Sequence, residues 1–344
     1  MYLYQNMNIS TDIKLDFNDV LIKPKKSSLK SRSEVNLIRE FHFPNTDQIW
    51  KGIPIIASNM DTIGTVSMYH SLKQFKILTC FHKFLNEYPE NDRNLYIISI
   101  GIQENDYIKI KNIYEKTPEK CNIICIDVAN GYMVDLIVFC QRVRELIPSA
   151  IIIAGNVVTS EATIDLILNG KVDIVKVGIG SGSVCTTRTQ TGIGMPQLSA
   201  VIECSKAAHS VGGYIISDGG ITNPGDASKA FGAGSDFVML GSILSGHDEC
   251  EGEIISENNI KYKIFYGMSS TYAMDKYYNG VNNYRSGEGK LVRVKYKGKV
   301  DNTIKDLLGG IRSTLTYTNS QNISDLPNNT YFYRVNNILN HIYN

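Results

Sequence analysis

Eight short apolar runs, rich in isoleucine and valine, recur along most of the chain. Most are continuous rather than alternating, which is typical of strands buried on both faces of a parallel sheet. Several end in Gly, Asp or Asn, residues that favour turns. Such a series limits the fold more than any other feature of the sequence. The runs are residues 53–57, 76–80, 95–101, 122–129, 151–155, 172–178, 214–220 and 236–242.

Stretches of helical character separate these runs. The clearest is residues 133–147, and further helices are predicted over 159–169, 197–211 and 224–232. Strand–helix alternation repeated eight times favours a (β/α)8 barrel, with an open doubly wound sheet as the alternative. The apolar positions at helical spacing in the first stretch, which we expect to face the barrel, are Val134, Ile137, Val138, Val143 and Ile147.

The helix over 159–169 carries its own end signals. Thr159 or Ser160 is expected as its N-cap, and Gly170 is expected to stop it. Barrel active sites lie at the C-terminal ends of the strands, where this chain places most of its Gly, Asp, Asn and Cys residues. We therefore expect the functional site at that face.

The 344 residues allow one large domain or two ordinary ones. We predict a single barrel domain over 1–344, with an N-terminal extension before the first strand at residues 1–50. The polar segment 250–300 follows the eighth strand and is interpreted as a flap or hairpin over the barrel mouth. The Asn-rich segment 318–344 is expected to be a peripheral tail.

Charge and cysteine usage exclude several classes of function. The formal net charge of +1 gives no general electrostatic reason for nucleic-acid or membrane binding. No run approaches the roughly 20 apolar residues of a membrane span, and the N-terminus has no signal-peptide pattern. Seven scattered cysteines without a CxxC pair argue against zinc and for reduced thiols, and hence for a cytoplasmic protein.

The loop over 178–197 is rich in glycine and hydroxyl residues and contains Cys185. The pattern Gly178-x-Gly180-x-Gly182 is only superficially a dinucleotide loop, because no helix follows at once. A thiol in a glycine-rich loop at a barrel mouth is accessible, and nearby amides and Arg188 can favour its thiolate. We interpret Cys185 as a nucleophile and the other six cysteines as buried thiols.

The loops after the seventh and eighth strands form the usual phosphate site of such barrels. Here they contain Gly219 and Gly220, and Gly241 with Ser242. Glycines at these positions expose backbone N–H groups to an anion, although each loop alone is equally an ordinary turn. Asp218 cannot favour a phosphate and suits a pair of sugar hydroxyls.

Two further segments carry polar residues with open roles. Asp127 and Asn130 follow the fourth strand and could hydrogen-bond a ligand, whereas Asn130 could equally cap the next helix. Glu288 lies between two glycines in the insertion. Taken alone, it is typical of an exposed surface charge.

These loops resemble the IMP dehydrogenase/GMP reductase family, and its reductase branch in particular. The pattern KVGIGSGSVCTTR is not generic, and the similarity runs from about Leu15 to Tyr317. It implies a barrel enzyme that reduces GMP to IMP with NADPH and releases ammonia. The matching segments are 15–32, 52–65, 127–132, 154–159, 176–188, 194–204, 215–220, 229–241, 265–270, 284–290 and 307–314.

The resemblance also implies a role for each loop. Cys185 would attack C2 of the purine and form a covalent adduct, while Thr187 and Glu288 would move protons. Ribose and phosphate would be held by Asp218, Gly219, Gly220, Gly241 and Ser242. The base would be held by Gly267, Met268, Ser269, Arg285, Ser286, Gly287 and Gly289.

The same resemblance implies an NADPH site, a monovalent cation, which we take to be potassium, and a homotetramer. The carbonyls of Gly180, Gly182 and Cys185 would hold the cation, with Arg188 beside it, since oxygen ligands suit a hard cation. Basic residues suit the 2′-phosphate of NADPH, and a neighbouring subunit would supply some contacts. The NADPH positions are Ser31, Arg32, Lys83, Asp127, Val128, Ala129, Gly180, Ser181, Tyr284, Ser313, Thr314, Leu315 and Thr316.

Two features favour the reductase over a dehydrogenase that has lost its regulatory insertion. The dehydrogenases carry that insertion after the second barrel strand, where Cys80 and Leu95 leave no room for one. Their flap also has an Arg-Tyr pair that activates water, whereas this chain has only Tyr284-Arg285 in the reverse order. Without water activation, the adduct should be reduced rather than hydrolysed.

The chain departs from the family pattern at two positions. Ser242 replaces a second glycine, and Phe84 replaces a second histidine, a change that could alter cofactor affinity. Two readings from other classes stay open at this stage. One is a nucleotide-binding barrel without turnover. The other is a flavin-dependent barrel oxidoreductase, which would not need the cysteine loop.

Overall fold

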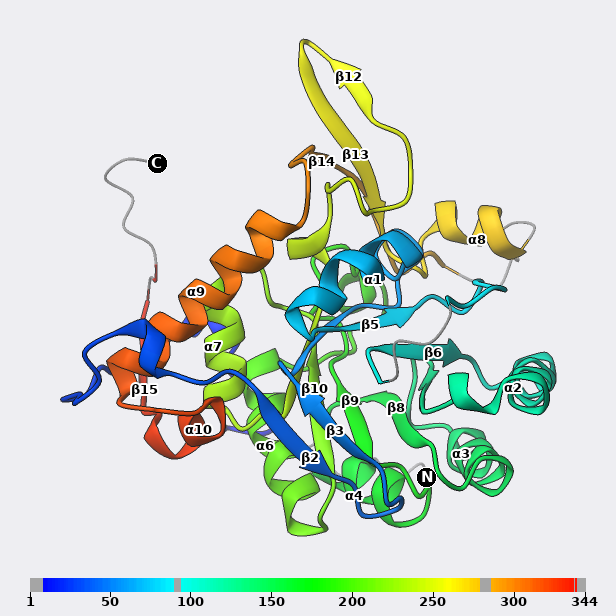
Figure 1. Ribbon diagram of the computed structural model, residues 1–344, viewed down its shortest axis with the longest axis horizontal. Helices are drawn as coiled ribbons and strands as arrows, with labels where there is room; N and C mark the ends of the chain where they lie inside the picture. Colours follow the sequence, from blue (N-terminus) through cyan, green and yellow to red (C-terminus); the bar gives the residue numbers. More distant parts are fainter. Residues whose placement is uncertain (1–8, 90–93, 279–285, 337, 339–344) are drawn as a thin grey trace, which may run out of the picture.

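The computed structural model describes residues 9–89, 94–278, 286–336 and 338. Eight parallel strands close into a barrel in the order β10-β11-β4-β5-β6-β7-β8-β9 (Figure 1). Each predicted apolar run supplies one strand, so the (β/α)8 prediction is confirmed and the open sheet is excluded. The strands are β4 (Ile55–Ala57), β5 (Leu78–Phe81), β6 (Tyr96–Ile100), β7 (Ile123–Asp127), β8 (Ile151–Val157), β9 (Ile174–Val177), β10 (Tyr214–Asp218) and β11 (Phe237–Leu240).

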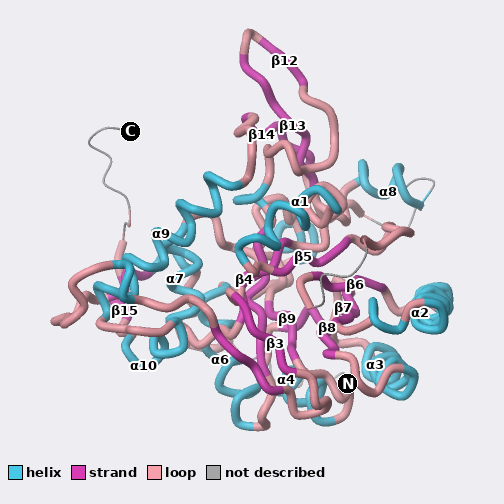
Figure 2. Tube along the Cα trace, in the orientation of Figure 1, coloured by secondary structure: helices cyan, strands magenta, loops and turns pink. Residues whose placement is uncertain are grey.

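Helices between the strands cover the outside of the barrel (Figure 2). Thr159 caps the fourth of them, because its hydroxyl accepts the Ala162 N–H, as the sequence predicted. The bounds are α1 (Val66–Leu72), α2 (Glu104–Lys116), α3 (Val134–Leu146), α4 (Ser160–Leu168), α5 (Thr187–Thr191), α6 (Gln197–Ser210), α7 (Pro224–Gly232) and α9 (Asp301–Thr318). None of the helices in the described ranges is long and apolar enough to cross a membrane.

The buried face of α3 differs from the predicted one. Val134 and Val138 are 75% and 49% exposed, so that part of the prediction was wrong. The helix instead buries Leu136, Phe139 and Cys140 together with Val143. Apolar residues surround most of this helix, so spacing alone is compatible with two faces. Packing selects the face that carries the bulkier Phe139 and Leu136.

An N-terminal hairpin closes the end of the barrel opposite the strand C-termini. Its strands are β2 (Arg39–His42) and β3 (Ile49–Gly52). Phe41 stacks on Phe237 with ring centroids 4.3 Å apart, and Trp50 lies 5.3 Å from the same ring. These aromatics form one buried cluster with the inward-facing strand residues, such as Ile56 and Ile153. Among the described residues, the hairpin thus covers this end of the barrel.

Replacing Trp50 with alanine should lower the free energy of unfolding by about 3–5 kcal/mol. The side chain is 1% exposed, and its Nε1 donates to the Asn94 carbonyl at 2.7 Å, so the change leaves a cavity and an unpaired acceptor. Urea denaturation followed by far-ultraviolet circular dichroism measures the loss, since the chain has one tryptophan and its fluorescence disappears. Trp50→Phe, which keeps most of the packing, should lose less than half as much.

The two ends of the chain meet on one side of the barrel. Strand β1 (Val20–Ile22) pairs antiparallel with β15 (Phe332–Arg334), which follows α10 (Leu326–Asn329). Ile323 and Leu326 are buried. The first part of the segment 318–344 is thus attached to the N-terminal extension, and differs in this respect from the peripheral tail that we expected.

The insertion after β11 contains a three-stranded antiparallel sheet and a helix. Its elements are β12 (Ile255–Glu257), β13 (Ile260–Tyr266), α8 (Thr271–Tyr278) and β14 (Leu291–Lys295). The β12–β13 hairpin projects away from the barrel (Figure 1). The opposite end of β13 leads into residues 267–269, which line the pocket described below. The segment therefore reaches the mouth with its base rather than with the hairpin tip.

Candidate active site

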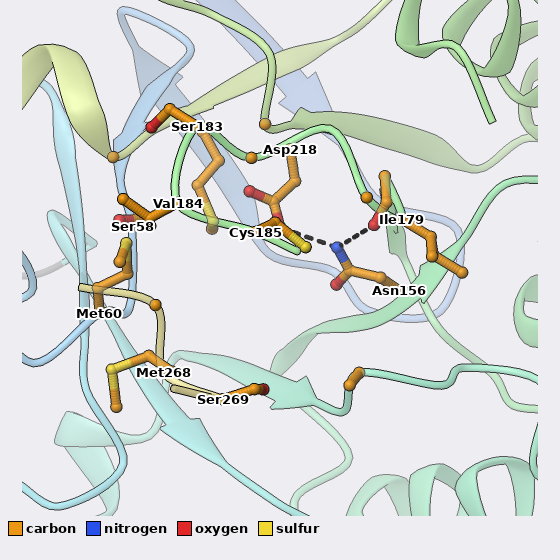
Figure 3. Close-up of a pocket in the computed structure, with 18 of the residues that line it drawn as sticks. Ser58, Met60, Asn156, Ile179, Ser183, Val184, Cys185, Asp218, Met268 and Ser269 are labelled. Carbon is orange, nitrogen blue, oxygen red and sulfur yellow. Dashed lines mark hydrogen bonds between the residues drawn. The ribbon is translucent and has the colours of Figure 1, made fainter. Parts of the chain in front are cut away.

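A pocket of about 280 Å³ opens where the barrel strands end, the face that the sequence predicted. Loops after β4, β7, β9, β10 and β11 contribute to its wall, β8 contributes Asn156, and the insertion adds residues 267–269 and Glu288. In Figure 3, Cys185, Asp218 and Asn156 lie on one side, and Met60, Met268 and Ser269 lie across from them. Segments far apart in sequence thus meet at one site.

Cys185, Thr187 and Glu288 form a hydrogen-bonded chain at this pocket. The Cys185 thiol donates to Thr187 Oγ1 at 3.2 Å, and that hydroxyl donates to Glu288 Oε2 at 2.6 Å. Backbone contacts hold the two segments together, because the Thr186 N–H donates to the Glu288 carbonyl at 2.9 Å. Cys185 is half-buried, whereas the other six cysteines are buried. The arrangement can move a proton from the thiol to a carboxylate.

Lys176 lies on the floor of the pocket and is 2% exposed. Its ammonium is 2.5 Å from Asp127 Oδ1 and 3.3 Å from Asp218 Oδ2. Burial alone would raise the pKa of Asp127, but Lys176 and a hydrogen bond from Asn59 lower it below its usual value. Burial likewise opposes the charge on Lys176, yet the two carboxylates hold its pKa well above normal. The floor therefore carries one ammonium between two aspartates.

Lys176→Met should destabilise the protein by about 3–5 kcal/mol at neutral pH, because it leaves Asp127 charged and unpaired. The loss should shrink as the pH falls, since protonation of Asp127 removes the unpaired charge. Urea denaturation at neutral and acidic pH measures both effects. The matched double variant, Lys176→Met with Asp127→Asn, should recover part of the loss. A deficit that does not change with pH would contradict this account.

The glycines after β10 and β11 line the pocket as predicted for a phosphate site. Gly219 has a φ of 94°, and a Cβ there would lie 2.4 Å from Ser181 Oγ. Only glycine fits this position without displacing the cysteine loop. Gly220, Gly241 and Ser242 also line the cavity. Asn156 donates to Asp218 Oδ2 at 2.9 Å and to the Gly178 carbonyl at 2.8 Å, and so orients the predicted sugar-binding carboxylate.

The predicted base-binding residues fall into two neighbouring segments. Gly267, Met268 and Ser269 line the pocket. Gly287 and Gly289 lie against the loop 267–271, and a Cβ on Gly289 would lie 3.1 Å from Gly267 Cα. Ser286 is exposed. Arg285, and Tyr284 of the NADPH set, lie outside the described residues.

The predicted NADPH residues divide into separate groups. Asp127, Val128, Ala129 and Gly180 line the pocket, and Ser181 donates to the Asp218 carbonyl at 3.0 Å. Lys83 lies beside α8, with its ammonium 5.4 Å from the centre of the Tyr278 ring. A third group packs together around the 3-10 helix Arg32–Glu34 and α9. None of this group is found among the described residues that line the pocket. Its members are Ser31, Arg32, Ser313, Thr314, Leu315 and Thr316.

Arg188, which we predicted beside the thiol and the cation site, is paired with the N-terminal extension. Its Nη1 pairs with Asp16 at 3.0 Å, and its Nη2 donates to the Met195 carbonyl at 2.8 Å. Asp16 belongs to the N-terminal extension, which sequence spacing did not connect with the cysteine loop. The methylenes of Arg188 pack against Gly180, where a Cβ would meet them at 2.6 Å. The Arg188 guanidinium thus attaches the cysteine loop to the N-terminal extension.

The loop has features that fit the predicted monovalent cation. The carbonyl of Gly182 accepts the Cys185 N–H at 3.0 Å, which brings two of the three proposed carbonyl residues together. The buried Thr186 hydroxyl has no hydrogen-bond partner among the residues described. Within the same ranges, no three His, Cys, Asp or Glu side chains gather as metal ligands. Oxygen atoms of the loop are therefore the available metal ligands among the described residues, and oxygen ligands suit a hard cation.

Sequence reasoning assigned no role to several residues of the pocket. Ser58, Asn59 and Met60 follow β4, and Asn156 is the last residue but one of β8. Lys176 carried a usable signal, because it is the one charged residue of the apolar stretch that forms β9, Ile174–Val177. The capping role considered for Asn130 is not observed. Its side chain accepts the Tyr132 N–H at 3.1 Å, and Met133 occupies the N-cap of α3.

The fold and the pocket define a (β/α)8-barrel enzyme whose mouth holds a half-buried cysteine beside glycine-rich loops. The model of the IMP dehydrogenase / GMP reductase domain matches residues 86–339. A GMP reductase of Buchnera aphidicola subsp. Acyrthosiphon pisum (strain Tuc7) is 54% identical over 347 residues, covering 98% of this chain and 99% of its own. A GMP reductase of Serratia proteamaculans (strain 568) is 51% identical, covering 96% and 97%.

A solved structure supports the same fold. It is that of a variant GMP reductase from Trypanosoma brucei in complex with guanosine 5′-monophosphate, with a TM-score of 0.84 and 24% sequence identity. It covers 95% of this chain and 96% of its own. This chain belongs to the IMP dehydrogenase/GMP reductase family.

Proposed function

We propose that this protein catalyses the reductive deamination of GMP to IMP, with NADPH as the reductant. The hydrogen-bonded chain of Cys185, Thr187 and Glu288 at the pocket carries this proposal. Relatives that match nearly the whole chain are named GMP reductase, which supports the choice of substrate. Purine nucleotide interconversion is the corresponding metabolic role.

The residues of the pocket provide a proton path for covalent catalysis. The Cys185 sulfur adds to C2 of the purine, and its proton passes through Thr187 to Glu288. The same path returns a proton to the 2-amino group, so that the C2–N bond breaks and ammonia leaves. NADPH supplies a hydride to C2, and the C2–S bond then breaks to release IMP and the free thiolate. The sum is GMP, NADPH and two protons giving IMP, NADP⁺ and ammonium.

Binding of the substrate would follow from the loops around the cysteine. Gly219, Gly220, Gly241 and Ser242 would hold the phosphate, and Asp218, oriented by Asn156, would accept the ribose hydroxyls. Residues 267–269 would contact the base from across the pocket. The carbonyls of Gly180, Gly182 and Cys185 would hold potassium and so stiffen the cysteine loop.

The arrangement of the predicted NADPH residues supports assembly into a homotetramer. Asp127 to Ala129 lie in the pocket, whereas Ser31, Arg32 and residues 313–316 gather elsewhere on the chain. A neighbouring subunit that presents its own copy of this second group would complete the cofactor site. All seven cysteines are unpaired, which supports a reducing compartment such as the cytoplasm.

Absorbance at the NADPH band tests the proposal directly. Purified protein with GMP, NADPH and potassium should lose the NADPH signal and release one ammonia per NADPH. A parallel reaction with IMP and NAD⁺ tests the dehydrogenase alternative. NADH formation there, without GMP-dependent oxidation, would establish a dehydrogenase. No absorbance change in either reaction, with GMP still bound, would favour a nucleotide-binding barrel without turnover. A flavin absorption spectrum of the purified protein would favour the flavin-dependent alternative.

A further inference from the structure

Asp61 receives three hydrogen bonds from the insertion. It lies in the loop after β4 and is 1% exposed. Its Oδ2 accepts from the hydroxyls of Tyr266 and Tyr277, the latter at 2.7 Å, and from the Lys276 ammonium at 3.0 Å. Tyr266 is the last residue of β13, and the other two donors lie on α8. One buried carboxylate of the barrel thus holds two elements of the insertion.

The loop 267–270 lies between these two points of attachment. Its first three residues line the pocket. Its backbone also holds the segment that carries Glu288, because the Glu288 N–H donates to the Ser269 carbonyl at 2.9 Å and the Gly267 N–H donates to the Lys290 carbonyl at 3.2 Å. Because Asp61 holds both ends of this loop, it also fixes the position and orientation of the Glu288 carboxylate relative to the Thr187 hydroxyl.

A ring contact strengthens the attachment of α8. Phe84, one of the departures from the family pattern, stacks on Tyr277 with centroids 3.7 Å apart and planes 3° from parallel. Burial, together with Asp61, raises the pKa of Tyr277 to about 12, so its hydroxyl remains a donor at neutral pH. Lys83 adds a contact with the neighbouring Tyr278 ring at 5.4 Å. The helix is thus held on the barrel by charge, hydrogen bonds and aromatic packing.

We propose that Asp61 is a positioning residue, which fixes the loop 267–270 and through it Glu288. Asp61 does not touch the reacting atoms in this proposal. It acts on the rate through the geometry of the Thr187–Glu288 pair, and this effect rests on the proposed function. The anchoring itself does not, because it is a property of the folded chain.

The rate effect is tested with Asp61→Asn, which keeps the size of the side chain and removes its charge. We expect kcat for GMP reduction to fall at least about tenfold, since small displacements of catalytic groups are costly. The matched control is Glu257→Gln. It removes a carboxylate of the projecting β12–β13 hairpin that pairs with Arg293 on β14. It should change kcat by less than about twofold, as expected of an exposed pair.

A double-mutant cycle distinguishes positioning from general destabilisation. In a Glu288→Gln background, Asp61→Asn should lower kcat by less than about twofold further, because both changes disable the same step. Multiplicative losses would overturn the proposal. Tyr277→Phe removes one donor only, and it serves if Asp61→Asn fails to fold. It should lower kcat by about two- to fivefold, with the same lack of additivity.

Hydrogen exchange tests the anchoring without reference to activity. In Asp61→Asn, peptides covering 264–270 and 286–292 should exchange faster than in wild type, and Glu257→Gln should leave them unchanged. Unchanged exchange in Asp61→Asn would refute the anchoring, even if the wild type reduces GMP. If exchange is faster in Asp61→Asn but the wild type does not reduce GMP, the proposed function is refuted and the anchoring stands.

Discussion

Cys185→Ala is expected to lower kcat for GMP reduction by at least about 10⁴-fold while GMP still binds. The sulfur forms the covalent bond to C2 in the proposed reaction, and no neighbouring side chain replaces it. The phosphate and ribose loops do not involve the thiol, so the GMP affinity should stay within about threefold. Spectrophotometric turnover and isothermal titration of GMP measure the two quantities.

Thiol labelling provides the control for this variant. Cys185 is half-buried and the other six cysteines are buried, so iodoacetamide should modify one residue of the native protein. Bound GMP should slow that reaction, and Cys185→Ala should take up no label. Turnover near the wild-type level in Cys185→Ala would exclude the covalent step. Rapid labelling of a second cysteine would show that the thiols differ less than their burial indicates.

Glu288→Gln should lower kcat by about 10²–10⁴-fold, the usual range for loss of a general acid–base group. The amide keeps the shape of the side chain, but it cannot take the proton that Thr187 passes on at 2.6 Å. The GMP affinity should change little, because the phosphate and ribose contacts lie in other loops. Steady-state kinetics with GMP and NADPH measures the effect on kcat, and isothermal titration measures the GMP affinity.

Thr187 offers matched variants for the same path. Thr187→Ser keeps the hydroxyl and should retain most activity, whereas Thr187→Val should resemble Glu288→Gln. Combining Thr187→Val with Glu288→Gln should cost little beyond either change alone, since both interrupt one path. A Glu288→Gln enzyme with normal kcat would leave Glu288 as an exposed surface carboxylate, the reading that its sequence context alone favours.

The barrel was predictable because its signal is local. Most strands are continuous apolar runs, and eight such runs separated by helices favour a closed barrel over an open doubly wound sheet. The cysteine loop was also visible, because a thiol among glycines has few structural uses. The glycines after β10 and β11 predicted a phosphate site because they follow the seventh and eighth barrel strands, where such barrels usually bind phosphate. Glu288 carried no such signal and entered only through the resemblance to a family.

Tertiary packing decided which partner each polar group takes. Lys176 was recognisable as an isolated charge in an apolar strand, but its place between Asp127 and Asp218 depends on how barrel closure arranges β7, β9 and β10. Arg188 was expected beside the Cys185 thiolate and the cation, and its guanidinium pairs with Asp16, 172 residues away. The buried face of α3 was likewise chosen by its neighbours.

The sequence by itself thus determined the number and kind of barrel strands, and it predicted the nucleophile and the phosphate loops, since these predictions follow from local composition and spacing. Only the tertiary structure placed Glu288 at 2.6 Å from Thr187 and joined Asp61 to Tyr266 and α8. Hydrogen bonds and ion pairs form between groups that meet in space, and barrel closure brings together loops separated by more than a hundred residues. The local sequence pattern does not indicate which of these distant residues come into contact.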